Sequence, residues 1–237
     1  MENKTAIILI HGYMGSPRQF DGIRKELGDF EGDIYCLTLP GHEKDASEFI
    51  KTDRFQWQQY TEDFIDGLRG EYERLILVGH SMGGLIAVQA AINKAEKIVG
   101  VIAIGFPIKV TVRRAWIKNG LLASRPCREN ESELVKAARS MSGVKMSRPT
   151  DYVRTLPCSS QFLRLARLSR KELSRLSVPL TVINFENDEI VSKGTKLFVE
   201  KSLPSAKILM LHGSYHFLFT ADEVGLMANE IKAMAGS

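Results

Sequence analysis

The sequence predicts an α/β fold in which helices flank a mostly parallel sheet of about six strands. First, short and nearly continuous apolar runs rich in β-branched residues recur along the chain, and such runs are typical of strands buried on both faces. Second, helical patterns separate these runs. Third, 237 residues with 44% apolar and 25% charged side chains suit one globular domain that can bury a sizeable core.

Six segments have the character of buried strands. They are "TAIILI" (5–10), "DIYCL" (33–37), "RLILVG" (74–79), "IVGVIAI" (98–104), "PLTVINF" (179–185) and "AKILML" (206–211). The regular alternation of these strands with helices implies a doubly wound arrangement, with connections that cross over the faces of the sheet.

Three helices follow from apolar spacing. Residues 82–92 are apolar nearly all round, which predicts a buried helix. In 55–69 the apolar stripe consists of Trp57, Tyr60, Phe64 and Leu68. Near the C-terminus it consists of Val224, Met227, Ala228, Ile231 and either Met234 or Ala235.

The segment 107–176 differs from the rest of the chain. It is far longer than an ordinary crossover between strands, and Lys109–Arg175 holds 16 basic against five acidic residues. Its last part, 159–176, has helical apolar spacing with arginines between. We interpret 107–176 as a helical cap inserted between two parts of a core, 1–106 and 177–237. Such a cap would cover the edge of the sheet where α/β proteins bind ligands.

The cysteines and the apolar runs indicate in which compartment the protein lies. Cys36, Cys127 and Cys158 are odd in number and lack metal-ligand spacing, so we expect reduced thiols. We also expect no metal and no organic cofactor. The run "AIILI" is too short for the core of a signal peptide, and no run approaches the length of a membrane helix. These features predict a cytoplasmic protein without an integral membrane segment. Nothing resembles a nucleic-acid surface, and the oligomeric state is left open.

The segment "LVGHSMGGL" (77–85) predicts a nucleophile. Gly79, Ser81 and Gly83 fit G-x-S-x-G, with a predicted strand before and a predicted helix after. Such a turn exposes the hydroxyl, and the helix N-terminus favours a developing oxyanion. The alternative is a plain tight turn.

A serine nucleophile needs a base and an orienting acid, which in this chain order lie later than the serine. For the base we favour His216, in the loop after the last strand, with His212 as the alternative. For the acid we favour Asp188, in the turn after 179–185. Glu186 and Glu189 stay open beside it.

The glycine-rich stretch "LIHGYMGSP" (9–17) follows the first strand and predicts an oxyanion hole. The N–H of Met82, next to the nucleophile, is one expected donor, and the N–H of Tyr13 is the other. Alone, the stretch 9–17 would be read as a glycine-rich turn.

Five segments together resemble the α/β-hydrolase family: "ILIHGYMGSPRQF", "LPGHE", "LVGHSMGGLIA", "NDEIV" and "GSYHF". Within it, the chain is most similar to small bacterial carboxylesterases and monoacylglycerol lipases. The resemblance covers almost the whole chain and implies Ser81, Asp188 and His216 as a catalytic triad. Tyr215 stands where the family often has glycine, and "IVS" continues where a proline often follows the acid.

These features predict a serine esterase acting on small to medium acyl esters, monoacylglycerols among them. A thioesterase, an amidase or peptidase, and a non-catalytic binding protein are the alternatives. Candidate substrate-binding residues are Phe106, Trp116, Leu121 and Phe162, each of which could equally be core of the cap. The basic cap would attract anionic esters or transiently contact a membrane surface, or be a solvated face.

Overall fold

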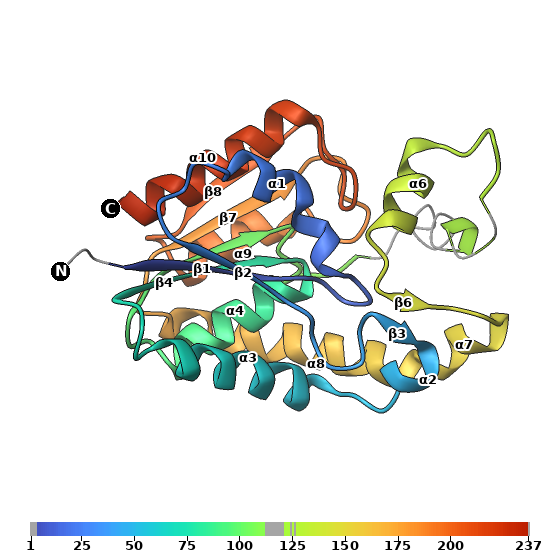
Figure 1. Ribbon diagram of the computed structural model, residues 1–237, viewed down its shortest axis with the longest axis horizontal. Coiled ribbons are helices and arrows are strands. Elements are labelled where there is room, and N and C mark those ends of the chain that lie inside the picture. Colours follow the sequence, from blue (N-terminus) through green and yellow to red (C-terminus); the bar gives the residue numbers. More distant parts are fainter. Residues whose placement is uncertain (1–3, 112–120, 124, 126, 237) are drawn as a thin grey trace.

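The computed structural model describes residues 4–111, 121–123, 125 and 127–236. Its centre is a sheet of six parallel strands in the order β2-β1-β4-β5-β7-β8 (Figure 1). The strand bounds match the predicted apolar runs within a residue or two, and the predicted fold class is confirmed. The strands are β1 (Thr5–Ile10), β2 (Asp33–Leu37), β4 (Arg74–His80), β5 (Ile98–Ile104), β7 (Leu180–Phe185) and β8 (Lys207–Leu211).

Alternation along each central strand divides the core into two layers. In β1, Ile8 packs into one hydrophobic cluster and Ile7 into the other, and in β4 the same holds for Leu77 and Ile76. Since both faces of these strands are apolar, both faces must be covered by helices.

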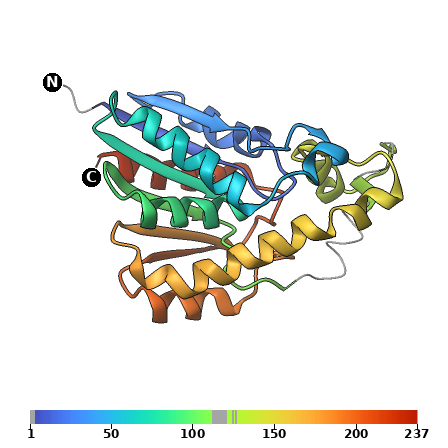
Figure 2. The ribbon, with the colours of Figure 1, turned by 90° about the horizontal axis from the view of Figure 1, so that it is seen from below.

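The helices lie on both faces of the sheet (Figures 1 and 2). One face is covered by α1 (Asp21–Glu26), which follows the 3₁₀ turn η1 (Pro17–Phe20), and by α10 (Ala221–Gly236). The other face is covered by α3 (Arg54–Leu68), α4 (Met82–Asn93), α8 (Leu156–Glu172) and α9 (Gly194–Ser202). Asp53 caps α3 by accepting from the N–H groups of Phe55 and Gln56, which fixes where that helix begins.

The segment predicted as a cap has two structural parts. Its first described part projects beyond the sheet and contains α6 (Glu133–Ser140), β6 (Val144–Lys145) and α7 (Pro149–Arg154). Its last part, α8 with the turn η2 (Leu173–Arg175), packs against α3 and α4, and Phe162 and Leu165 join the same core cluster as the strands. The helical pattern of 159–176 thus belongs to a helix of the core layer.

A second, two-stranded sheet ties the projecting part to the core. β3 (Lys44–Asp45), just before α2 (Ala46–Phe49), pairs in parallel with β6. Neither strand was predicted, because two residues carry no measurable periodicity.

Gly83, in the first turn of α4, should tolerate no side chain. A Cβ there would overlap the carbonyl oxygens of Ile10 and His11, which are rigid backbone groups. We expect Gly83→Ala to lower the free energy of unfolding by about 3 kcal/mol or more, measured by urea denaturation.

The matched control is Gly225→Ala in α10, where nothing lies within 4 Å of the added methyl group. We expect this variant to gain about 0.5–1 kcal/mol, since alanine loses less backbone entropy than glycine in a helix. Equal stability of the two variants would contradict this account of the turn.

Candidate active site

Ser81 occupies the sharp turn between β4 and α4. Its φ of 52° and ψ of −121° lie outside the regions that side-chain-bearing residues prefer. The turn is held by its own backbone, because Ser81 N–H donates to the Ile104 carbonyl at 2.8 Å and Gly84 N–H donates to the Ser81 carbonyl at 2.9 Å. A Cβ at Gly79 would overlap the backbone of Gly83, so this position also requires glycine. Strain of this kind is characteristic of functional turns.

The side chains of Ser81, His216 and Asp188 form a continuous hydrogen-bonded chain. Ser81 Oγ lies 2.9 Å from His216 Nε2, and His216 Nδ1 lies 2.8 Å from Asp188 Oδ2. His216 is fully buried, and only 5% of Ser81 is exposed. An ionised Asp188 can only accept, so Nδ1 carries the imidazole proton and Nε2 is free to accept from the serine hydroxyl. This is the geometry of a base ready to take the proton of a nucleophile.

Backbone groups hold Asp188 in place. Its Oδ1 accepts from the N–H groups of Ile190 and Val191, both at 2.7 Å. Burial opposes ionisation of this carboxyl, but the charge and hydrogen bond of His216 and the two N–H donors outweigh it, and its pKa is lowered. Asp188 is therefore an anion at neutral pH and can orient and stabilise the imidazole.

Two of the three residues weighed as alternatives lie away from Ser81, and the third contacts the backbone of His216. His212 and Glu186 pair with each other on the surface, with His212 Nδ1 3.0 Å from Glu186 Oε2. The hydrogen bond that His212 donates to Glu186 raises the pKa of His212. Glu189 contacts the site differently, because its Oε2 accepts from the backbone N–H of His216 at 3.4 Å.

The predicted oxyanion donors flank Ser81. Met82 is the first residue of α4, where an N–H has no partner within the helix. None of the described residues accepts a hydrogen bond from the Tyr13 N–H. At Gly12, a Cβ would lie 2.9 Å from Ser81 Cβ, so glycine lets this loop approach the serine closely. The Tyr13 hydroxyl points away to the cap helices, at 3.0 Å from Ser159 Oγ.

Two side chains that the sequence did not single out support this arrangement. Gln19 Oε1 accepts from the Gly12 N–H at 2.8 Å and lies 2.9 Å from His80 Nδ1. His80 Nε2 lies 3.0 Å from the carbonyl oxygen of His216. Burial and the neighbouring His216 lower the pKa of His80 to about 3, and a neutral ring donates to only one of these two oxygens at a time. His80 thereby lies between the predicted oxyanion loop and the loop that holds His216.

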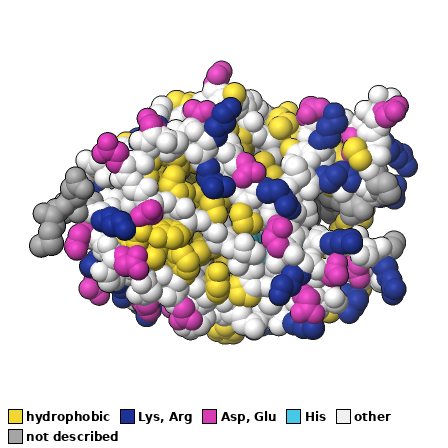
Figure 3. All heavy atoms as spheres, viewed as in Figure 1, with side chains coloured by type: hydrophobic (Ala, Val, Ile, Leu, Met, Phe, Trp, Pro, Cys, Tyr) yellow, Lys and Arg dark blue, Asp and Glu magenta, His cyan; other side chains and the backbone are white. Residues whose placement is uncertain are grey.

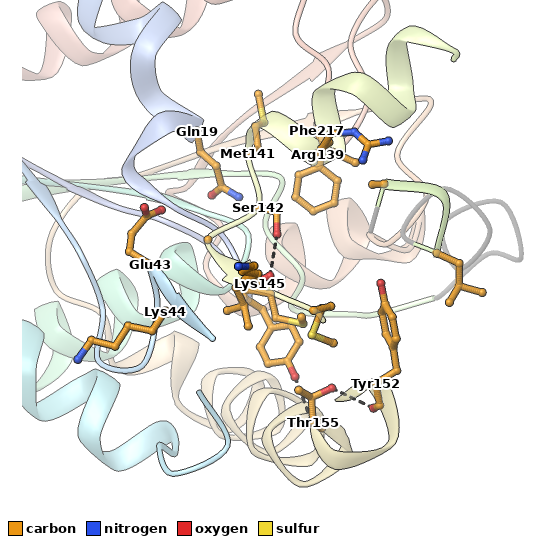
Figure 4. Close-up of a pocket in the computed structure, with 18 of the residues that line it drawn as sticks. Gln19, Glu43, Lys44, Arg139, Met141, Ser142, Lys145, Tyr152, Thr155 and Phe217 are labelled. Atoms are coloured by element: carbon orange, nitrogen blue, oxygen red, sulfur yellow. Dashed lines mark hydrogen bonds between the residues drawn. The ribbon is translucent and has the colours of Figure 1, made fainter. Parts of the chain in front are cut away.

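A cavity of about 980 Å³ lies between the projecting part of the cap and the core (Figure 4). Tyr13, Gln19 and Phe217 bring its wall next to the Ser81 turn and the His216 loop. Met141 and Tyr152 come from the cap side. Most of its lining surface is apolar. The size and character suit a ligand with a hydrocarbon chain.

The candidate substrate-binding residues are distributed unequally. Leu121 lines the cavity. Phe106 is fully buried and Phe162 stacks on Tyr13 at 5.6 Å between ring centroids, and neither is part of this cavity's wall. Trp116 lies outside the described residues. Sequence reasoning missed Glu189 and Phe217 as lining residues, although both adjoin the predicted acid and base.

In the described part of the chain, no group of three or more His, Cys, Asp or Glu side chains is arranged to hold a metal ion. In the same residues, no helix is both long and apolar enough to cross a membrane.

Several known proteins are similar to this chain. The "Pimeloyl-[acyl-carrier protein] methyl ester esterase" of Nitrosomonas europaea is 23% identical over 92% of this chain and 90% of its own length. Among solved structures, one from a study of the metagenome-derived lipolytic enzymes LipS and LipT superposes with a TM-score of 0.76 and 18% identity, covering 99% of this chain and 95% of the other. The monoacylglycerol lipase of Paleococcus ferrophilus gives 0.68 and 17%, covering 97% and 94%.

The family assignment rests on a match over most of the sequence. The model of the family described as "Alpha/beta hydrolase family" matches residues 7–227. With the six-stranded parallel sheet and the serine turn at its centre, the chain is a member of the alpha/beta hydrolase family.

Proposed function

We propose that this chain is a serine carboxylic-ester hydrolase for small to medium acyl esters, monoacylglycerols among them. The observation that carries the proposal is the hydrogen-bonded chain Ser81–His216–Asp188 beside a mostly apolar cavity. The esterase and lipase names of similar proteins support it. As part of the proposal, 1–106 and 177–237 form the hydrolase core and 107–176 the inserted cap, whose last helix also packs on the core.

In the proposed mechanism, Ser81 Oγ attacks the acyl carbon while His216 Nε2 takes the hydroxyl proton. The N–H groups of Tyr13 and Met82 stabilise the tetrahedral oxyanion. His216 then gives its proton to the departing alcohol. Water, activated by the same histidine, hydrolyses the acyl-enzyme and releases the acid, while Asp188 holds the imidazole throughout.

The proposal is tested with three matched substrate series. Turnover is measured on p-nitrophenyl esters from acetate to laurate, and on thioesters and anilides with the same acyl chains. We expect the esters to be hydrolysed, with the best chain length reporting the depth of the cavity. Thioesters or anilides as the preferred series would favour the thioesterase or amidase alternative. Stoichiometric binding without turnover would favour a non-catalytic protein.

Glu189 should select substrates by charge. Its side chain is 9% exposed, lines the cavity and pairs with no cation among the described residues. Glu189→Gln keeps an acceptor for the His216 N–H and removes the charge. We expect kcat/KM to rise about fivefold for an ester whose acyl chain ends in a carboxylate, from about 1 kcal/mol of relieved repulsion.

The neutral ester of equal length is the internal control, and its kcat/KM should change by less than twofold. Equal changes for the charged and the neutral ester would mean that Glu189 positions the His216 loop without selecting substrates.

A second candidate substrate is an ester carried on an acidic protein. The similar Nitrosomonas europaea protein is named for an acyl-carrier-protein ester. In this chain, Arg164, Arg167 and Lys171 are exposed on α8 and pair with no acidic side chain among the described residues. Basic side chains also gather over the cap side of the face in Figure 3.

The dependence of the hydrolysis rate on ionic strength distinguishes this candidate from a small ester. Hydrolysis of a carrier-protein ester should slow steeply as ionic strength rises and in Arg164→Glu/Arg167→Glu, while p-nitrophenyl butyrate is unaffected. Equal salt dependence for both substrates would remove the carrier protein from consideration.

A further inference from the structure

The projecting part of the cap is hydrogen-bonded directly to the predicted oxyanion loop. Gly143 N–H donates to the Met14 carbonyl at 2.8 Å, and Gly15 and Ser142 form an antiparallel bridge. Ser16 Oγ donates to the Met141 carbonyl at 3.3 Å. Residues 14–16, directly after Tyr13 in this loop, are therefore paired with residues 141–143.

Arg18 adds a second connection at this contact between residues 14–18 and residues 140–143, which we call the joint. Its Nε donates to the Ser140 carbonyl and its Nη2 to the Ser142 carbonyl, both at 2.9 Å, and Nη2 lies 3.3 Å from Glu43 Oε1. One guanidinium thus joins the oxyanion loop, the cap and the segment before β3. A guanidinium suits this task because it presents several donors in a fixed plane.

The two backbones at the joint are closely packed. A Cβ at Gly143 would overlap the Gly15 carbonyl oxygen, so the backbones can approach this closely because residue 143 is glycine. Met14 adopts a φ of 52°, which a methionine rarely does without support from its surroundings. Since Met14 follows Tyr13, whatever holds Met14 also sets the direction of the peptide group beside it.

The cavity lies against this joint. Tyr13, Met14 and Arg18 form part of its wall from the core side, and Ser142 and Gly143 from the cap side. Figure 4 shows Ser142 beside the space that the other lining residues surround. A cap that served only as a cover would need no hydrogen bonds to the oxyanion loop.

We propose that residues 140–143 of the cap position the oxyanion loop, with Arg18 and Gly143 as the positioning residues, so that the cap contributes to kcat as well as to substrate binding. The proposal rests on the esterase function above. A displacement of about 1 Å in a positioned group can cost about 100-fold in rate, so a partial loosening of this loop has a measurable effect.

The test compares Arg18→Ala with Arg24→Ala. Both side chains are about half exposed, and the ion pair that Arg24 makes among the described residues is with Asp21 in its own helix. For Arg18→Ala we expect kcat on p-nitrophenyl butyrate to fall about tenfold with KM within twofold, at unchanged Tm. Arg24→Ala should match the wild type. Arg18→Lys, which keeps the charge but not the planar array of donors, should be intermediate.

A second readout separates positioning from general loosening. A trifluoromethyl ketone forms a tetrahedral adduct with a nucleophilic serine, and its oxyanion occupies the oxyanion hole. Its inhibition constant should weaken in Arg18→Ala by the same factor as kcat/KM. Inhibition by the non-electrophilic amide of the same chain should not change. Gly143→Ala, if it folds, should show the same two effects.

The outcomes are distinguishable. A raised KM at unchanged kcat, or unchanged ketone affinity, would overturn the positioning role while leaving the esterase function intact. A wild type that neither hydrolyses esters nor binds the ketone would instead overturn the proposed function.

Discussion

Ser81→Ala should abolish ester hydrolysis, with kcat reduced about 10⁴- to 10⁶-fold. The Ser81 hydroxyl is the atom that His216 Nε2 faces at 2.9 Å, and no other group described here contacts both that nitrogen and the turn before α4. Removing the nucleophile leaves only water attack assisted by the oxyanion donors. The measurement is release of p-nitrophenol under saturating substrate, together with covalent labelling by a fluorophosphonate.

The fold should be unaffected by this change. The backbone hydrogen bonds of residue 81 do not involve its side chain, and alanine adds no atom to the turn. The variant should therefore keep the wild-type Tm, and the exposed Ser205→Ala should keep full activity as the matched control. Full hydrolysis by Ser81→Ala would remove the serine mechanism, and labelling of the variant would place the nucleophile elsewhere.

The central sheet could be predicted from the sequence because it depends on local signals, and local signals also select the residues proposed as the triad. Continuous apolar runs such as 74–79 identify strands buried on two faces, and G-x-S-x-G at a strand end identifies the turn. The order of serine, acid and base, together with the positions of the loops after the last two strands, then favoured Asp188 and His216 over His212 and the two glutamates. The structure brings these two side chains to Ser81 and leaves His212 with Glu186.

The remaining features depend on tertiary contacts that no local pattern encodes. Phe106 and Phe162 are large apolar side chains after a strand and on a helix, and a core position and a cavity wall demand the same residue types. The role of Gln19 rests on two partners, Gly12 and His80, that are brought to it only by the fold. The pairing of β3 with β6 spans about a hundred residues of sequence with two residues on each side.

The protein should lose stability steeply between pH 6.5 and pH 5, because three histidines are buried in the neutral form. Burial, with His42 nearby, lowers the pKa of His11 to about 3, and burial lowers the pKa of His42 to about 4. For His80, burial and His216 lower the pKa to about 3. The His11 contacts agree, since its Nε2 accepts from the Leu39 N–H at 3.1 Å and a proton there would face that donor.

The direction of the effect follows from proton linkage. Each folded-state pKa lies below the unfolded value of 6.5, so the unfolded chain binds protons first as the pH falls. The stabilisation is complete above pH 6.5 and is lost toward pH 3–4. At pH 5 each histidine lowers the free energy of unfolding by about 2 kcal/mol, and the three together lower it by about 6 kcal/mol. That is comparable with the whole stability of many domains, so we expect unfolding near pH 5.

Urea denaturation between pH 7 and pH 5 measures this loss in a range where most carboxyl groups do not yet titrate. The free energy of unfolding should fall by about 4 kcal/mol per pH unit at the lower end of that range, which corresponds to about three protons taken up. His42→Gln should reduce the number of protons taken up on unfolding by about one, whatever its effect on the free energy of unfolding at pH 7. His212→Gln, at an exposed histidine whose pKa is raised instead, should not reduce it. A flat profile in the wild type would mean that the buried rings accept protons without unfolding. A charged His80 ring would then donate to both Gln19 Oε1 and the His216 carbonyl.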